Sequence, residues 1–188
     1  MGSFYVNYTV RGSSQEAVAT ALVGRVAIVT ALQNGCVVVF DEESENQDLS
    51  VIDGLAARLS GGLQCPVLAV LNHDDDILLY RLYVRGNLAD DYDSTPGYFD
   101  PNAEPSEPSG GKAETLCEAF PSADALLVEQ VLRKSTFSDD GYVFQTERHG
   151  DLVSALGTSS FAVGFGYTYV AAGELPDGLT HTDLTTVA

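Results

Sequence analysis

The run His73-Asp74-Asp75-Asp76 is the densest group of possible metal ligands in the chain. Carboxylates bind hard cations, but a calcium loop needs acids at alternate positions followed by glycine, and Ile77 follows here. Asp is also a residue that tight turns prefer. We therefore expect a solvated hairpin turn, and the alternative is a metal site built from His73, Asp74 and Asp76.

A second candidate is Glu147-Arg148-His149, in a stretch with helical spacing that leads to an apolar stripe beginning at Leu152. His149 can switch its charge near neutral pH, and Arg148 is a fixed donor in a chain with few cations. Both are candidate binding residues. The general rule that charged residues lie outside favours the other interpretation, a helix start whose polar side faces water.

Residues 94–111 contain four of the seven prolines, among Ser, Gly and acidic residues. This composition predicts a long flexible connection, either a linker or a functional loop. The pair Tyr98-Phe99 within it is expected to be pinned to the body of the protein. Tyr98 and Phe99 are therefore the third candidate binding site.

Other patterns for catalysis are missing from the sequence. There is no Gly-x-Ser-x-Gly elbow, and Gly164-Phe165-Gly166 lacks the third glycine of a dinucleotide fingerprint. The three cysteines, Cys36, Cys65 and Cys117, show no paired spacing, which favours a reducing, cytoplasmic environment. We expect no cofactor, and the lack of these motifs favours a protein that is not an enzyme without deciding the question.

The chain is strongly acidic, with 27 acidic against nine basic residues and a net charge of -18 at pH 7. Nucleic-acid binding needs a basic surface, so we expect no nucleic-acid partner. Anionic membranes are disfavoured for the same reason, and the apolar runs are too short for a membrane span. The acidity suits a protein partner with a basic surface, although a general bias for solubility explains it too.

The spacing of apolar residues predicts the order β-α-β-β-α-β over the first part of the chain. The expected strands lie over residues 4–10, 25–32, 36–41 and 66–71. The first helix lies between Ser13 and Gly24, and the second runs over 48–60 and ends at Gly61-Gly62. This order is that of the ferredoxin-like split βαβ arrangement, with strand 4–10 near the centre of an antiparallel sheet and both helices on one face.

Two extra antiparallel strands are expected over residues 77–85 and 88–93. A Gly86-Asn87 turn of type II′ would join them. The resulting register places Asp90 diagonal to Arg81 and Arg85, so we expect Asp90 to contact one of these arginines.

The remainder reads as a helical C-terminal part that ends in an aromatic strand. Helices are expected over residues 112–120, 123–134 with Ser122 as N-cap, and 146–156. The aromatic strand is expected over 161–170, and a polar tail over 176–188. The expected parts are thus a sheet core (1–93), a connection (94–111) and a helical segment (112–188), which form one compact α+β unit.

The sequence alone assigns no function. The best interpretation is a non-catalytic intracellular protein that binds or regulates another protein, because the elements are well specified while chemistry is missing. The alternative is a metal-assisted hydrolase that uses His73, Asp74 and Asp76. A homo-oligomer is left open.

Overall fold

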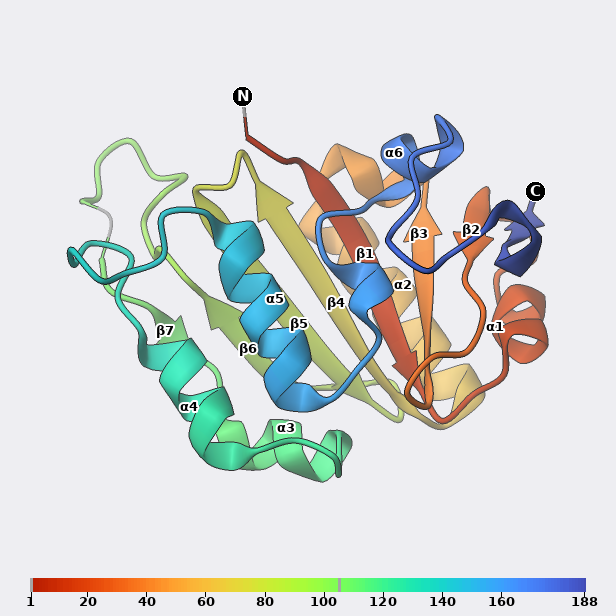
Figure 1. Cartoon of the computed structure of the whole chain (residues 1–188), viewed down its shortest axis with the longest axis horizontal. Coiled ribbons are helices and arrows are strands. Elements are labelled where there is room, and N and C mark those ends of the chain that lie inside the picture. Colours follow the sequence, from red (N-terminus) through yellow and green to blue (C-terminus); the bar gives the residue numbers. More distant parts are fainter. Residues whose placement is uncertain (1, 105) are drawn as a thin grey trace.

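The computed structural model describes residues 2–104 and 106–188, whose strands form one eight-stranded antiparallel sheet in an α+β fold. The order across the sheet is β7-β6-β5-β4-β1-β3-β2-β8 (Figure 1). The strands are β1 (Tyr5–Arg11), β2 (Ala27–Val29), β3 (Cys36–Asp41), β4 (Pro66–His73), β5 (Ile77–Val84), β6 (Asn87–Asp93), β7 (Ser109–Gly110) and β8 (Thr185–Val187).

Six α-helices and three short 3-10 helices join these strands within the described residues. The α-helices are α1 (Gln15–Ala21), α2 (Leu49–Leu63), α3 (Ala113–Ala119), α4 (Ala125–Arg133), α5 (Gln145–Leu156) and α6 (Tyr167–Ala171). The 3-10 helices are η1 (Glu43–Asn46), η2 (Ser160–Ala162) and η3 (His181–Asp183). None of the helices that the structure describes is long and apolar enough to cross a membrane.

Strand β1 lies in the interior of the sheet, as its sequence predicts. It is antiparallel to β3 on one side and to β4 on the other, so that Tyr8 pairs with both Val39 and Ala69. Strand β2 joins the outer side of β3. The first four strands therefore lie in the order β4-β1-β3-β2, and β1 is buried along Tyr5–Val10 because both of its faces are covered.

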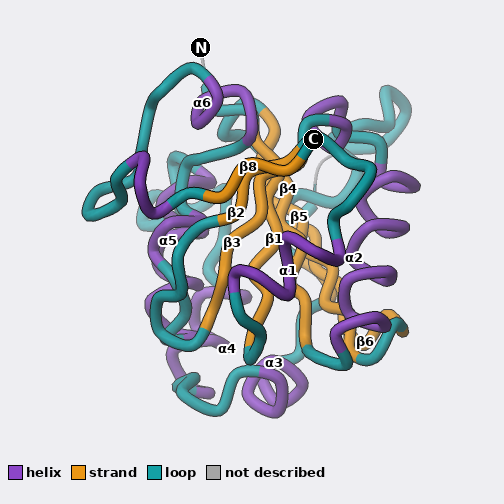
Figure 2. Tube along the Cα trace, turned by 90° about the vertical axis from the view of Figure 1, so that its right-hand side faces the viewer, coloured by secondary structure: helices purple, strands orange, loops and turns teal. Residues whose placement is uncertain are grey.

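Helices cover both faces of the sheet. Helices α1 and α2 pack on one face, where Val18, Leu22, Ile52 and Leu59 contact the strands. On the other face, α3, α4 and α5 cover β4–β6, while η2 and α6 cover β2 and β3. Figure 2 shows the strands as the middle layer, with α2 on one side and α5 on the other.

Helix α2 continues through Gly61-Gly62, so the prediction that these glycines end it is wrong. It ends at Leu63, and the C-cap residue Gln64 adopts the left-handed conformation (φ 54°). Gly61 has another role, because a Cβ there would lie 3.4 Å from the Cα of Gly86. Glycine therefore lets the helix approach the β5–β6 turn closely.

The β5–β6 turn lies one residue earlier than predicted. Arg85 (φ 52°) and Gly86 (φ 82°) occupy its two central positions, and Val84 pairs with Asn87. Two consecutive positive φ values define a type I′ turn, whose twist matches that of the flanking strands. A bulge at Leu82/Tyr83 then shifts the register again.

Because of this shift, the expected contact of Asp90 with an arginine is wrong. Asp90 pairs with Leu82 and is buried on the opposite face of the sheet from Arg81. Its carboxylate accepts hydrogen bonds from the Tyr80 hydroxyl at 2.7 Å and from the backbone of Lys112 at 2.8 Å. Arg81 instead forms an ion pair with Asp53 at 2.8 Å.

The predicted aromatic strand over 161–170 is also wrong, since this segment forms η2, a loop and α6. Two side chains from distant parts of the chain hold it. The Asn7 amide donates to the carbonyls of Ala162 (2.6 Å) and Phe165 (2.8 Å). The Glu45 carboxylate accepts from the Tyr167 N–H at 3.1 Å and so caps α6.

Two smaller corrections concern the C-terminal part. The N-cap of α4 is Asp124, whose carboxylate accepts from the N–H groups of Leu126 and Leu127, rather than Ser122. The predicted polar tail contains β8, which pairs with β2 at the edge of the sheet. The amide of Gln15 on α1 helps to hold this edge, because it donates to the carbonyls of Val29 and Asp183.

Candidate functional site

His73, at the end of β4, is surrounded by three aromatic rings. Its ring centroid lies 4.8 Å from that of Phe4, 5.0 Å from Phe99 and 6.0 Å from Tyr98, all in edge-to-face geometry. Phe4 lies close because it precedes β1, whose Tyr5 pairs with Asn72 next to His73. The structure thus brings together His73, Tyr98 and Phe99, which belong to two different candidate sites of the sequence.

The loop that carries Tyr98 and Phe99 is held against the β4–β5 turn. The Tyr98 hydroxyl donates to the Asp76 carboxylate at 2.9 Å, and the Thr95 hydroxyl donates to the Asp76 carbonyl at 3.2 Å. These two bonds fix the loop near the sheet, although Phe99 remains 58% exposed. An exposed aromatic ring on a fixed backbone is a common feature of binding surfaces.

Phe99 and His73 form part of the wall of an open hollow of about 320 Å³. This hollow, the His73 pocket, is lined by Asn46, Gln47, Leu49, Leu71, His73, Leu79 and Phe99. Its apolar walls come from the first turn of α2, from β4 and β5, and from the loop after β6. Its polar residues come from the end of η1, from Gln47 and from the end of β4.

The hydrogen bonds of Gln47 determine which ring nitrogen of His73 carries a proton. The Gln47 amide nitrogen donates to the Asn72 carbonyl at 2.8 Å, so its oxygen is the atom 2.6 Å from His73 Nδ1. An amide oxygen only accepts, so Nδ1 carries the hydrogen. The other ring nitrogen, Nε2, is not used by Gln47.

The three carboxylates that follow His73 accept hydrogen bonds from different neighbours. Asp74 accepts from the Gly2 N–H at 2.8 Å, Asp75 from the Ser3 N–H at 3.0 Å, and Asp76 from Tyr98. Across residues 2–104 and 106–188, no three His, Cys, Asp or Glu side chains are placed to share a metal ion.

Asp75 has a structural role that its sequence context does not indicate. Its Oδ1 accepts hydrogen bonds from the N–H and hydroxyl of Thr146 and from the Asn72 amide, and so caps the N-terminus of α5 from another part of the chain. Burial would raise the pKa of this carboxyl, but hydrogen bonds from Thr146, Ser3 and Asn72 outweigh it and hold the pKa below its ordinary value.

Arg148 is fully buried and is not available to a partner. Its guanidinium donates to the carbonyls of Val131 and Lys134 at the C-terminal end of α4, and to the Tyr92 hydroxyl, at 2.8–2.9 Å. It also donates to Gln145 at 2.8 Å. Among the described residues, no carboxylate forms an ion pair with Arg148. The C-terminus of α4 carries partial negative charge and compensates the charge of the guanidinium instead.

His149 is buried as well, and it does not face water as the alternative interpretation required. Its Nδ1 lies 2.8 Å from the Tyr5 hydroxyl oxygen, which accepts from the Asn72 amide at 3.2 Å. Asn72 in turn bonds Asp75, so a chain of hydrogen bonds connects His149 to the β4–β5 turn. Burial lowers the pKa of His149 from 6.5 to about 3, so the ring is neutral near pH 7.

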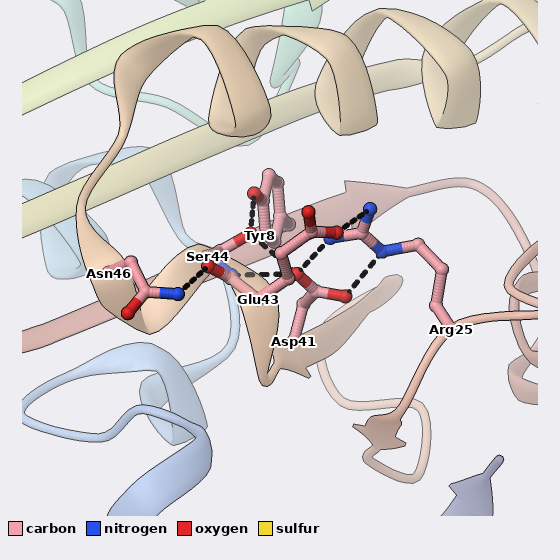
Figure 3. Close-up of polar contacts among 6 residues, drawn as sticks. All are labelled: Tyr8, Arg25, Asp41, Glu43, Ser44 and Asn46. Atoms are coloured by element: carbon pink, nitrogen blue, oxygen red, sulfur yellow. Dashed lines mark hydrogen bonds and ion pairs between the residues drawn. The ribbon is translucent and has the colours of Figure 1, made fainter.

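A second polar cluster, shown in Figure 3, contains a serine between a tyrosine and an aspartate. The Ser44 hydroxyl donates to Asp41 and lies 2.6 Å from the Tyr8 hydroxyl, and Asp41 forms an ion pair with Arg25. Ser44 and Asp41 are fully buried. This arrangement resembles activation of a nucleophile, but no substrate could reach the hydroxyl, and its role is to fix the start of η1.

A further hollow of about 340 Å³ lies between α4 and α5. The Tyr142 ring lies at its wall, with the Lys134 ammonium 4.2 Å from the ring centroid. The Tyr142 hydroxyl donates to Asp151 at 2.7 Å. The Lys134 ammonium and the Tyr142 hydroxyl at this hollow are thus already in contact with groups of the chain itself.

Sequence reasoning missed most of the His73 pocket. Leu49 fits the apolar stripe of α2, yet it is 41% exposed at the start of the helix. Asn46 and Gln47 follow an acidic stretch and carry no motif. The pair Tyr98-Phe99 was the one sequence pattern that pointed to this pocket, because two adjacent aromatic residues in a proline-rich loop need a surface to pack against.

The geometry therefore points to the His73 pocket as the candidate site, open at the surface and free of a metal or nucleophile arrangement among the residues described. Comparison with known protein families, with curated proteins and with solved structures finds no match for this chain.

Proposed function

We propose that this chain is a non-catalytic protein-binding protein, and that the His73 pocket is its docking site for a partner with a basic surface. The observation that carries the proposal is Phe99, which is 58% exposed at the wall of an open hollow, next to Tyr98, whose hydroxyl is hydrogen-bonded to Asp76. Exposed aromatic residues around a hollow commonly anchor protein interfaces.

The surroundings of the pocket support a basic partner. Asp48 lies between the lining residues Gln47 and Leu49, Asp74 follows His73, and Asp100 follows Phe99. These carboxylates are among the 27 acidic residues that give the chain its net charge of -18. Complementary charge of this kind raises the association rate and selects against acidic partners.

We also propose that β1, α1, β2, β3, α2 and β4 form a ferredoxin-like unit, which supplies one part of the pocket wall while β5 and the loop after β6 supply the other. Two observations support this assignment: the order β4-β1-β3-β2, and the packing of α1 and α2 in one core on the same face. The fold itself hosts many functions and adds nothing to the choice among them.

The proposal is tested by selecting a random peptide library on the immobilised chain. We expect the selected peptides to be rich in Lys, Arg and apolar residues, and their affinity to fall as salt rises. Phe99→Ser should weaken them on the order of tenfold, because it removes an aromatic contact.

The matched control is Phe137→Ser, since Phe137 is 54% exposed but does not line the pocket. This variant should bind the selected peptides as the parent does. Peptides that bind equally well to the parent and to Phe99→Ser, or a library that yields no binder, would show that the pocket is not a docking site.

A further inference from the structure

We infer that the His73 pocket receives the side chain of a lysine or arginine of the partner. Its aliphatic stem would lie against Leu49, Leu79 and Phe99, and its charged end would reach Asn46 and His73. This inference rests on the proposed docking function and specifies the chemistry of the residue that enters.

The walls of the pocket suit an aliphatic stem. Leu49, Leu71, Leu79 and Phe99 contribute four apolar side chains to a hollow of about 320 Å³. Lysine and arginine bury their methylene groups along such surfaces while the charged end remains hydrogen-bonded.

The polar residues of the pocket present acceptors. The Asn46 amide nitrogen donates to the Glu43 carbonyl at 3.1 Å (Figure 3). Asn46 Oδ1 accepts no hydrogen bond from the described residues. Both ends of the Gln47 amide are used, by Asn72 and His73. Asn46 Oδ1 only accepts, so an occupant that reaches it has to donate a hydrogen bond, as an ammonium or a guanidinium does.

The charges around the pocket favour the same occupant. The nearby N-terminus of α2 would attract an anion, but the Asp48 carboxylate accepts from the Ser50 N–H at 2.8 Å and occupies that position. Arg81 lies two residues beyond Leu79 on the same strand, but Asp53 pairs with it at 2.8 Å. The two positively charged features near the pocket, the start of α2 and Arg81, are therefore already paired with carboxylates.

Three small probes of similar length test the inference: n-butylammonium, 1-butanol and butanoate. Each is titrated into the full chain labelled with ¹³C, and the NMR signals of the Leu49, Leu71 and Leu79 methyls and of the His73 ring are followed. We expect n-butylammonium to shift these signals with a Kd about threefold lower than that of 1-butanol. Butanoate should bind more weakly than both.

Asn46→Leu removes one acceptor and should abolish the preference for n-butylammonium over 1-butanol. Asn102→Leu is the control, since Asn102 lies in the exposed loop outside the pocket, and it should keep the preference.

Equal binding of n-butylammonium and 1-butanol would overturn this inference and leave the docking function standing on the peptide selection. Tighter binding of butanoate would overturn it in favour of an acidic occupant. Probes that shift none of the pocket signals would overturn both the inference and the assignment of this pocket as the docking site.

Discussion

The buried imidazole of His149 makes the stability of the protein dependent on pH in a defined window. The unfolded ring has an ordinary pKa of 6.5, whereas burial lowers the pKa to about 3 in the native state. Between these values the unfolded chain binds a proton that the native state does not. The free energy of unfolding therefore falls as the pH decreases from 6.5 towards 3.

The size of this effect follows from the two pKa values. Between pH 7.5 and pH 5, proton binding to the unfolded ring lowers the free energy of unfolding by roughly 2 kcal/mol. For a chain of this length, that corresponds to a decrease in Tm of roughly 4–8 °C. Other groups titrate in the same range, so the contribution of His149 has to be isolated with a variant.

The variant is His149→Asn, whose side chain can still form a hydrogen bond with the Tyr5 hydroxyl at the position of Nδ1. We expect it to be less stable than the parent at pH 7.5, because it leaves a cavity. Its loss of stability between pH 7.5 and pH 5 should be smaller than that of the parent by roughly 2 kcal/mol. The assay is urea unfolding at constant ionic strength, followed by circular dichroism.

The control is His181→Asn, because His181 is exposed. It should keep the pH dependence of the parent. If His149→Asn and the parent lose the same free energy of unfolding on acidification, the buried neutral ring does not contribute as described.

Two further predictions concern charged groups at helix ends. Asp75→Asn should lower the free energy of unfolding by about 1–2 kcal/mol at pH 7, because it weakens the cap of α5, whereas the exposed Asp76→Asn should change it by less than about 0.5 kcal/mol. The pKa of Asp75 is depressed in the native state, so the charged carboxylate contributes its full stabilisation above pH ~4 and loses it as the pH falls through the native pKa. The free energies of unfolding of the parent and of Asp75→Asn, measured with urea, should therefore converge at low pH. Arg148→Met should lower the free energy of unfolding by about 3 kcal/mol or more in the same assay, because it leaves the carbonyls at the end of α4 without the donor that Arg148 supplies. Arg58 is exposed, and an equally large loss for Arg58→Met would contradict this explanation.

The sequence predicted the elements whose patterns depend on neighbouring residues. Strands β1 and β3 and the helices at 49–63 and 145–156 lie close to where the spacing of apolar residues placed them. These signals are local, because a strand or helix with one buried face repeats at its own period.

The misplaced segment at 161–170 shows where local reasoning ends. Its alternation of aromatic residues and glycine is typical of a strand, but Asn7 and Glu45 bind its backbone as a loop and a helix start. Arg148 is a similar case: charged residues usually lie outside, and only the folded chain shows that the end of α4 supplies its acceptors. Such contacts join residues far apart in the sequence, and no local pattern encodes them.

The pairing of β8 with β2 has a consequence for the synthesis of the chain. The outer edge of β2 and the apolar side chains Ile28, Val38 and Phe40 are covered by residues 161–187. A ribosome makes β2 and β3 long before these residues emerge, so the growing chain presents an open apolar sheet edge for most of its translation. Exposed edges of this kind pair readily with other chains. Until residues 161–187 fold onto it, this part of the sheet stays open to pairing with other chains.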